Sequence, residues 1–113
     1  MHEYSVTKSM LDTVLDEAQK AGASKIIEIK LVIGDLSSIV AESVQLMFEL
    51  LSENTAAEGA RLHFKRVPAL FKCKDCNLEY EKPRIGFSCP SCGKEGMPTG
   101  AGREFYIESI EVD

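Results

Sequence analysis

The stretch KIIEIKLVIGD, residues 25–35, decides the fold of this chain. Its aliphatic side chains recur with a period of two, at Ile27, Ile29, Leu31 and Ile33. This alternation predicts a β-strand that buries one face, and Gly34-Asp35 predicts a turn at its end. A strand of this kind needs apolar elements to cover it, and the segments on both sides supply them.

The segment before the strand, residues 4–21, has the period of a helix. Its apolar side chains recur every four residues, at Val6, Met10, Val14 and Ala18. They form one apolar face, which we expect to pack on the sheet. Ser5 or Thr7 is predicted to cap the start of this helix, and Gly22 is predicted to end it.

A second amphipathic helix is predicted in LSSIVAESVQLMFELLSEN, residues 36–54. Its apolar face consists of Val40, Val44, Met47 and Leu51, with Phe48 alongside. Ser37 or Ser38 is the predicted N-cap residue.

Two further strands are predicted in RLHFKRV, residues 61–67, and REFYIESIEV, residues 103–112. In the first of them, Leu62 and Phe64 share one face and His63 lies on the other. The order of helices and strands predicts an α+β fold, with a small three-stranded sheet and two helices on one face. The pairing register of the last strand stays ambiguous by pattern alone.

The composition changes in residues 71–97, where cysteines and turn-forming residues replace most of the aliphatic ones. We therefore predict an inserted, zinc-ribbon-like metal domain in residues 71–97. The α+β domain would then consist of residues 1–70 and 98–113.

The chain as a whole has 113 residues, 44% hydrophobic content and a net charge of −5. An acidic chain repels phosphate backbones, so we expect no nucleic acid partner. No run approaches the roughly 20 apolar residues of a membrane helix, and the N-terminus lacks the pattern of a signal peptide. We therefore expect a cytoplasmic protein with no membrane partner, where paired cysteines hold metal more often than they form disulfides.

Cys73, Cys76, Cys89 and Cys92 form the motif C-x2-C-x12-C-x2-C and leave no cysteine over. Two residues between cysteines allow a tight turn that aims both sulfur atoms at one point, and Gly93 makes the second turn easier. The predicted occupant is a tetrahedral Zn²⁺ bound by four thiolates at about 2.3 Å. Because the protein would fill all four positions, we expect a structural site and not a catalytic one.

Other occupants and roles compete with structural zinc at this motif. Disulfides and idle thiols are disfavoured by the expected compartment and by the spacing. Iron is a real competitor, since similar knuckles hold one iron in rubredoxin-like electron carriers. A zinc ribbon that binds DNA or RNA is the remaining alternative. The nearby basic residues first serve to offset the charge of about −2 on a zinc tetrathiolate; they are Lys72, Lys74, Lys82, Arg84 and Lys94.

A second metal site is predicted at the start of the chain, Met1-His2-Glu3. The amine of Met1 and the deprotonated amide of His2 would close a five-membered chelate ring, and that amide with the imidazole Nδ1 a six-membered one. Square-planar nitrogen geometry suits Ni(II) or Cu(II). The fourth donor stays open between the amide or carboxylate of Glu3, another side chain such as His63, and a partner protein.

With both predicted metal sites taken together, the sequence resembles the hydrogenase nickel-incorporation HypA/HybF family. The likeness rests on MHEYS at residues 1–5, on VIGDLSSI at residues 32–39 and on the cysteine motif, and it spans essentially the whole chain. It implies that His2 binds Ni²⁺, that Glu3 contributes to that site, and that the four cysteines bind Zn²⁺.

The resemblance also implies a metallochaperone and not an enzyme. The protein would deliver nickel to the large subunit of a [NiFe]-hydrogenase together with the GTPase HypB, and some relatives serve urease maturation. The sequence agrees, because it contains no Ser/His/Asp set and no phosphate-binding glycine loop. Certain relatives use a further histidine near the zinc domain, and no histidine occurs here in residues 64–113.

Overall fold

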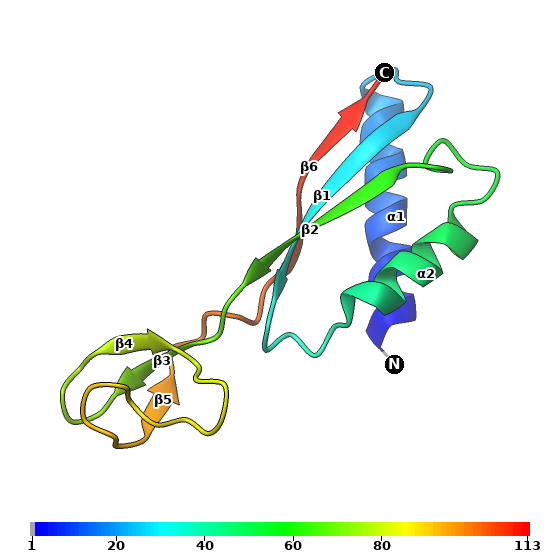
Figure 1. The fold of residues 1–113 in the computed structure, drawn as a ribbon. Helices are drawn as coiled ribbons and strands as arrows, with labels where there is room; N and C mark the ends of the chain where they lie inside the picture. The colour runs from blue at the N-terminus through cyan, green and yellow to red at the C-terminus, as the bar shows by residue number, and fades with distance from the viewer. Residues whose placement is uncertain (1) are drawn as a thin grey trace.

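The computed structural model of the protein describes residues 2–113, apart from the side chain of His2. Within this part, two helices and six strands follow one another as labelled in Figure 1. Their bounds are α1 His2–Lys20, β1 Ile26–Gly34, α2 Ala41–Leu51, β2 Arg61–Val67, β3 Leu70–Cys73, β4 Glu79–Glu81, β5 Gly96–Pro98 and β6 Phe105–Val112.

The first sheet has the strand order β2-β1-β6, with β1 in the middle. β1 and β2 pair in parallel. The segment that connects them, which includes α2, returns the chain to the end of the sheet where β1 begins. β6 runs antiparallel along the other side of β1. The predicted three-stranded sheet is therefore confirmed, and the structure supplies the register that the sequence left ambiguous.

Both helices pack on one face of this sheet, and a single apolar core fills the space between the layers (Figure 1). Met10, Val14 and Ala18 of α1 are buried in it, together with Val44 and Phe48 of α2. These positions are among those that the helical periods predict, but Val40, predicted on the apolar face of α2, lies at its N-cap and is 50% exposed. Burial stabilises each of the large side chains by about 1.5–3 kcal/mol relative to exposure.

β1 departs from the predicted alternation because of a β-bulge. Its pairing with β6 shifts register between Ile26 and Glu28, so two residues of β1 lie opposite one of β6. A bulge changes which face the residues before it occupy. Ile26 is consequently fully buried while Ile27 is 41% exposed, and the predicted burial of Ile27 is wrong.

α1 ends where the sequence predicts but starts earlier. Gly22 has φ +71°, and the Ala23 N–H donates to the Ala18 carbonyl at 2.9 Å, which closes the helix. α1 begins at His2, so Ser5 and Thr7 lie inside it and the caps predicted there are wrong. An acidic residue in the first turn, Glu3, stabilises this early start through the helix dipole.

α2 has no serine cap, contrary to the prediction. Its N-cap residue is Val40, which makes no side-chain capping bond. The Ser37 hydroxyl instead accepts a hydrogen bond from the Ile39 N–H at 3.3 Å, within the turn that precedes the helix. The Glu3 carboxylate of α1 accepts the Val40 N–H at 3.1 Å, so a residue from another helix takes the capping role.

The second sheet, β4-β3-β5, forms a separate unit beyond the end of β1 (Figure 1). Both neighbours of β3 run antiparallel to it, so the chain enters and leaves this unit at adjacent points. The molecule is elongated as a result. Its radius of gyration is 17.7 Å, whereas a compact chain of this length would have about 13 Å.

A narrow neck of backbone contacts joins the two units. A Cβ atom on Gly34 would lie 2.1 Å from the carbonyl oxygen of Gly102, so the two backbones touch with no room for a side chain. The Leu36 N–H donates to that same carbonyl at 2.6 Å. The Leu36 side chain packs against the small core of the second unit, which includes Phe71 and Tyr80. The residues that follow β1 therefore anchor the second unit to the first.

Candidate metal centre

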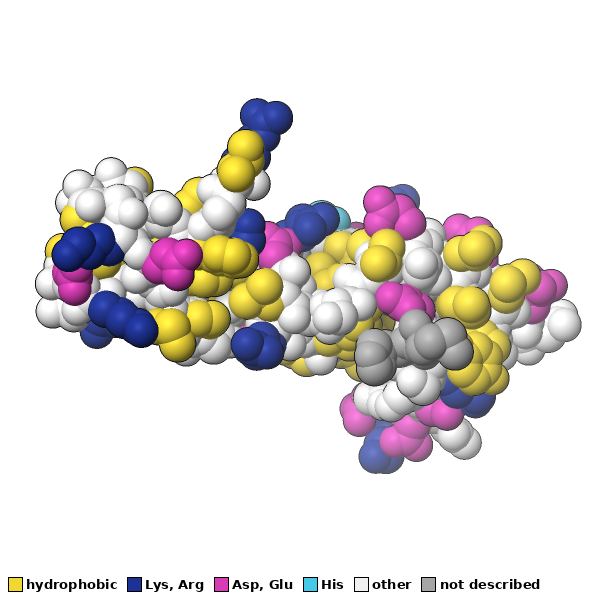
Figure 2. All heavy atoms as spheres, turned by 90° about the horizontal axis from the view of Figure 1, so that it is seen from below, with side chains coloured by type: hydrophobic (Ala, Val, Ile, Leu, Met, Phe, Trp, Pro, Cys, Tyr) yellow, Lys and Arg dark blue, Asp and Glu magenta, His cyan; other side chains and the backbone are white. Residues whose placement is uncertain are grey.

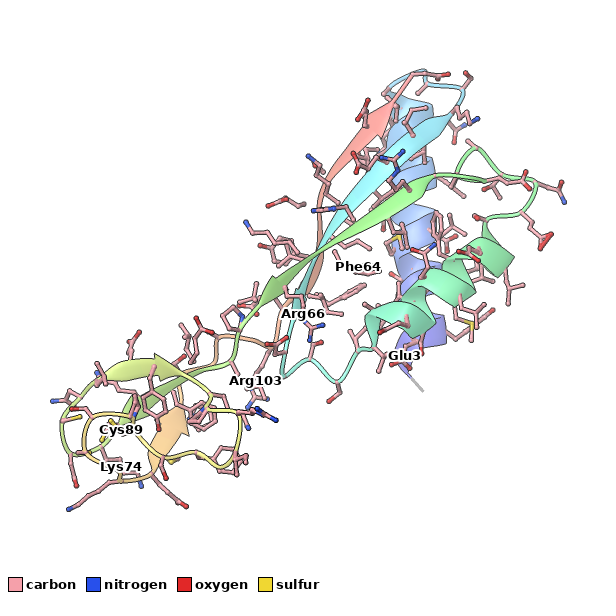
Figure 3. All side chains as sticks on the ribbon, in the orientation of Figure 1. Glu3, Phe64, Arg66, Lys74, Cys89 and Arg103 are labelled. Carbon is pink, nitrogen blue, oxygen red and sulfur yellow. The ribbon has the colours of Figure 1, made fainter. Side chains whose placement is uncertain are left out.

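The structure brings the four predicted cysteines together inside the second unit (Figure 3, near the label of Cys89). Their Sγ atoms all lie within 4.8 Å of one another. The Cys73–Cys92 pair is 3.3 Å apart and the Cys76–Cys89 pair 3.6 Å. Four sulfur atoms bound at about 2.3 Å to a tetrahedral ion would lie about 3.8 Å from one another. The cluster therefore fits a tetrahedral Zn²⁺ after small side-chain adjustments.

Two backbone turns of the same kind aim the sulfur atoms. In the first, the Cys73 carbonyl accepts the Asn77 N–H at 3.1 Å, and Asn77 has φ +62°. In the second, the Cys89 carbonyl accepts the Gly93 N–H at 2.9 Å, and Gly93 has φ +80°. Glycine and asparagine tolerate this left-handed backbone best. The sequence carries a signal for both turns, since Asn77 directly follows Cys76 as Gly93 follows Cys92.

The four thiols cannot all ionise side by side without a cation. The N–H groups of Cys76 and Asp75 donate to the Cys73 sulfur and lower the pKa of Cys73 to about 7. The Lys94 N–H acts in the same direction on Cys92, but the neighbouring Cys73 and partial loss of solvent contact outweigh it and raise the pKa of Cys92 to about 12. A divalent cation removes the repulsion by binding all four as thiolates, so metal binding releases protons.

The four cysteines supply a complete set of ligands, as a structural metal site requires. Cys73 and Cys89 are buried, whereas Cys76 and Cys92 form the exposed side of the cluster. No disulfide joins these four cysteines. Because protein sulfur would fill every position of a tetrahedral ion, no position remains for a substrate or for a transferable ligand.

A small aromatic core supports the cluster from the side of the sheet. The Tyr80 hydroxyl donates to the Phe87 carbonyl at 2.6 Å, and burial raises the pKa of Tyr80 so that it stays a donor. The Phe71 and Phe87 rings stack with centroids 5.5 Å apart. A Cβ atom on Gly96 would lie 2.4 Å from the Tyr80 hydroxyl, so β5 needs glycine there. The sequence did not predict this core, because the residues that form it come from three separate segments.

Two of the predicted charge-offsetting basic residues have other partners. Lys94 pairs with Asp75 at 2.9 Å, which links the two cysteine turns across the cluster. Lys82 Nζ lies 5.0 Å from the centroid of the Phe87 ring and donates to the Pro83 carbonyl at 3.2 Å. Both contacts are largely exposed, so their contribution to stability is small.

At the predicted nickel site, Met1 and the side chain of His2 lie outside the described residues. Glu3 is described, and it lies at the start of α1 beside the loop before α2 (Figure 3). The hydrogen bond from the Val40 N–H lowers the pKa of the Glu3 carboxyl below its ordinary value. Glu3 thus carries a negative charge at neutral pH and fixes the first turn of α1 against the start of α2.

His63 lies on the other side of the sheet from both helices. It is exposed and pairs with Lys30 across β1 and β2, whereas Leu62 and Phe64 pack toward the core. The sheet therefore separates the His63 imidazole from Glu3. This placement disfavours His63 as a fourth ligand at the N-terminus of the same chain.

An α+β fold of two helices on a three-stranded sheet, joined to a separate four-cysteine metal centre, defines the class of this protein. The chain belongs to the HypA family, described as hydrogenase/urease nickel-incorporation metallochaperones, and it matches that family over residues 1–112. The predicted family is confirmed, and with it the prediction of a metallochaperone and not an enzyme.

Similar proteins agree with this assignment over the full length. The hydrogenase maturation factor HypA of Caldanaerobacter subterraneus subsp. tengcongensis is 47% identical over 114 residues, which cover all of both chains. The HypA of Dehalococcoides mccartyi is 44% identical and is covered to 95%.

Two solved structures have the same fold. A solution structure of HypA protein matches 99% of this chain and 96% of that chain, with a TM-score of 0.69 and 28% identity. The solution structure of the Ni metallochaperone HypA from Helicobacter pylori matches 97% and 96% of the two chains, with a TM-score of 0.62 and 25% identity. In the described part of the chain, neither helix is long and apolar enough to cross a membrane.

Proposed function

We propose that this protein is a nickel metallochaperone for the maturation of [NiFe]-hydrogenase. It binds Ni(II) at Met1, His2 and Glu3 and delivers the ion to the hydrogenase large subunit in the cytoplasm, with the GTPase HypB as its partner. The observation that carries this proposal is membership of the nickel-incorporation family over residues 1–112. The same family description includes urease, so urease maturation is a second possible destination for the nickel.

The chemistry of the four-cysteine cluster supports a separate site for the delivered ion. A cluster with four protein thiolates holds its metal as a resident structural ion, and Zn²⁺ suits it best. A metal that is handed on must bind at a site that opens easily. Nitrogen donors at the start of α1 meet this need, because a movement of one helical turn would release the ion.

Glu3 has two possible roles at such a site. If its carboxylate binds nickel, the ion competes with the Val40 N–H, which now donates to that carboxylate at 3.1 Å. If its backbone amide binds nickel, the hydrogen bond to Val40 persists and Glu3 positions the site. Glu3→Gln separates the two roles: it keeps the amide and a neutral acceptor for Val40, and it removes the charged ligand.

Calorimetric titration of the untagged protein with Ni²⁺ tests the proposal. We expect His2→Ala to abolish tight nickel binding while the zinc content stays unchanged. His63→Ala is the matched control, since it removes an imidazole from the exposed face of the sheet and should bind nickel like wild type. Wild-type nickel affinity in His2→Ala would refute the proposed site.

A further inference from the structure

An aliphatic side chain projects from the second unit where nothing in the fold requires it. Ile85 is 85% exposed, the highest value among the large hydrophobic residues described, and it lies in the loop of residues 82–87 between β4 and the second cysteine pair. Phe87, two residues further, is 47% exposed. Figure 2 shows hydrophobic and basic side chains together on a projection from this unit. The loop therefore presents apolar surface to the solvent at a protruding point.

This 82–87 loop is anchored at both of its ends. At the first, the Lys82 N–H donates to the Ala69 carbonyl at 2.9 Å. At the second, Phe87 stacks on Phe71 and its carbonyl accepts the Tyr80 hydroxyl at 2.6 Å. Anchoring both ends of a short loop reduces the conformational entropy that its tip loses on binding.

The 82–87 loop itself is basic, although the chain as a whole is acidic. Residues 82–94 contain three basic side chains and no acidic one, while the chain has a net charge of −5. Lys94 pairs with Asp75, and Lys82 lies over the Phe87 ring. Within residues 2–113, Arg84 forms no ion pair, so its guanidinium is available beside Ile85. An aliphatic anchor next to an available cation fits an apolar pocket rimmed by carboxylates.

The loop also lies on the unit that does not carry the proposed nickel site. The loop belongs to the second unit, whereas α1 begins in the first unit (Figure 1). Docking through the loop would leave the N-terminus accessible while the partner is bound. A protein that transfers a metal ion needs this separation, because the contact that holds the recipient must not block the site that releases the ion.

We propose that Ile85, flanked by Arg84, is the anchor that docks this protein into an acidic-rimmed apolar pocket on the hydrogenase large subunit. The identity of that partner rests on the proposed function, whereas the anchor rests on the exposure of Ile85 and on the anchored ends and charge of the 82–87 loop. Ile85 supplies the apolar contact that sets the dissociation rate. Arg84 supplies the electrostatic steering that sets the association rate.

Binding kinetics on the purified, immobilised large subunit test this inference. Ile85→Ser should weaken binding by about tenfold or more, mainly through faster dissociation. Arg84→Glu should slow association and reduce its dependence on salt. Met97→Ser is the matched control, because Met97 is a 53% exposed side chain of the same unit, and it should bind within about twofold of wild type.

The outcomes separate the anchor from the nickel site. Binding of Ile85→Ser within about twofold of wild type would overturn the inference, and so would an equal loss in Met97→Ser. Zinc content and nickel titration of Ile85→Ser should match wild type, since an 85% exposed side chain supports neither site. If wild-type protein binds nickel but not the large subunit, the docking inference fails and the nickel site stands. If His2→Ala keeps its nickel while Ile85→Ser no longer binds the large subunit, the proposed nickel site fails and the docking inference stands.

Discussion

Replacing Gly34 by alanine should uncouple the two units of the molecule at the neck. The new Cβ atom would lie 2.1 Å from the carbonyl oxygen of Gly102 and 2.7 Å from the Arg103 nitrogen. Carbon and oxygen in contact need well over 3 Å, so the two backbones must separate by about 1 Å. Neither neighbour is a flexible side chain that can move aside.

The separation acts on the hydrogen bonds that cross the neck. The Gly34 N–H donates to the Glu104 carbonyl at 2.7 Å, and the Leu36 N–H donates to the Gly102 carbonyl at 2.6 Å. Losing each bond destabilises the fold by about 1 kcal/mol. Partial exposure of the Leu36 side chain, which packs on the second core, adds about 1 kcal/mol. We therefore expect the free energy of unfolding to fall by about 3 kcal/mol.

Urea unfolding of the zinc-loaded protein, followed by circular dichroism, measures this loss. Gly59→Ala is the control: Gly59 has φ +79° but no atom within 4 Å of an added Cβ, so it reports only left-handed strain. That strain costs about 1–2 kcal/mol. If Gly34→Ala destabilised the protein no more than Gly59→Ala, the contact argument would be refuted. Zinc content should survive in Gly34→Ala, because the turns around the cysteines are closed within the second unit.

Three further predictions concern the two units of the molecule. A Cys76→Ser/Cys92→Ser variant should lose zinc and the order of the second unit while α1, α2 and the first sheet persist, as two-dimensional NMR would reveal; retained zinc would contradict this. Tyr80→Phe should lower the free energy of unfolding of the second unit by about 1 kcal/mol, measured by hydrogen exchange, because the Phe87 carbonyl loses its shorter hydrogen bond and keeps only the Gly96 N–H at 3.4 Å; unchanged protection of that unit would oppose it. Since the Val40 N–H lowers the pKa of Glu3, the stabilisation from that hydrogen bond should be present at neutral pH and disappear as the pH falls through the lowered pKa. The NMR shift of the Val40 amide should follow this titration in wild type; the same titration in Glu3→Gln would contradict the assignment.

Local periodicity was sufficient to predict most of the helices and strands of the first unit. The helical faces of α1 and α2 and the inward face of β2 follow from spacing, because each residue's neighbours along an element are set by the geometry of that element alone. The four cysteines were equally accessible to prediction, since the motif itself determines which sulfur atoms can converge. Asn77 could have been found as well, because it repeats the position that Gly93 occupies after the second pair.

The errors arose where a partner distant in sequence decides the outcome. Ile27 faces the solvent because the pairing with β6 places a bulge in β1, and no residue pattern within residues 25–35 predicts that bulge. The predicted serine cap of α2 was wrong for a related reason. Glu3, 37 residues away in sequence, accepts the Val40 N–H, so the segment before α2 needs no serine at its cap.

The sequence by itself determined the class of this protein: two amphipathic helices, three alternating strands, a four-thiol metal motif and a family signature. These features depend on spacing along the chain, and spacing is local. Only the tertiary structure decided that Glu3 holds the start of α2, that Gly34 and Gly102 meet backbone to backbone, and that Ile85 projects from an anchored loop. Each of these is a contact, or the lack of one, between segments far apart in sequence. Such contacts form only when the packed core brings those segments together.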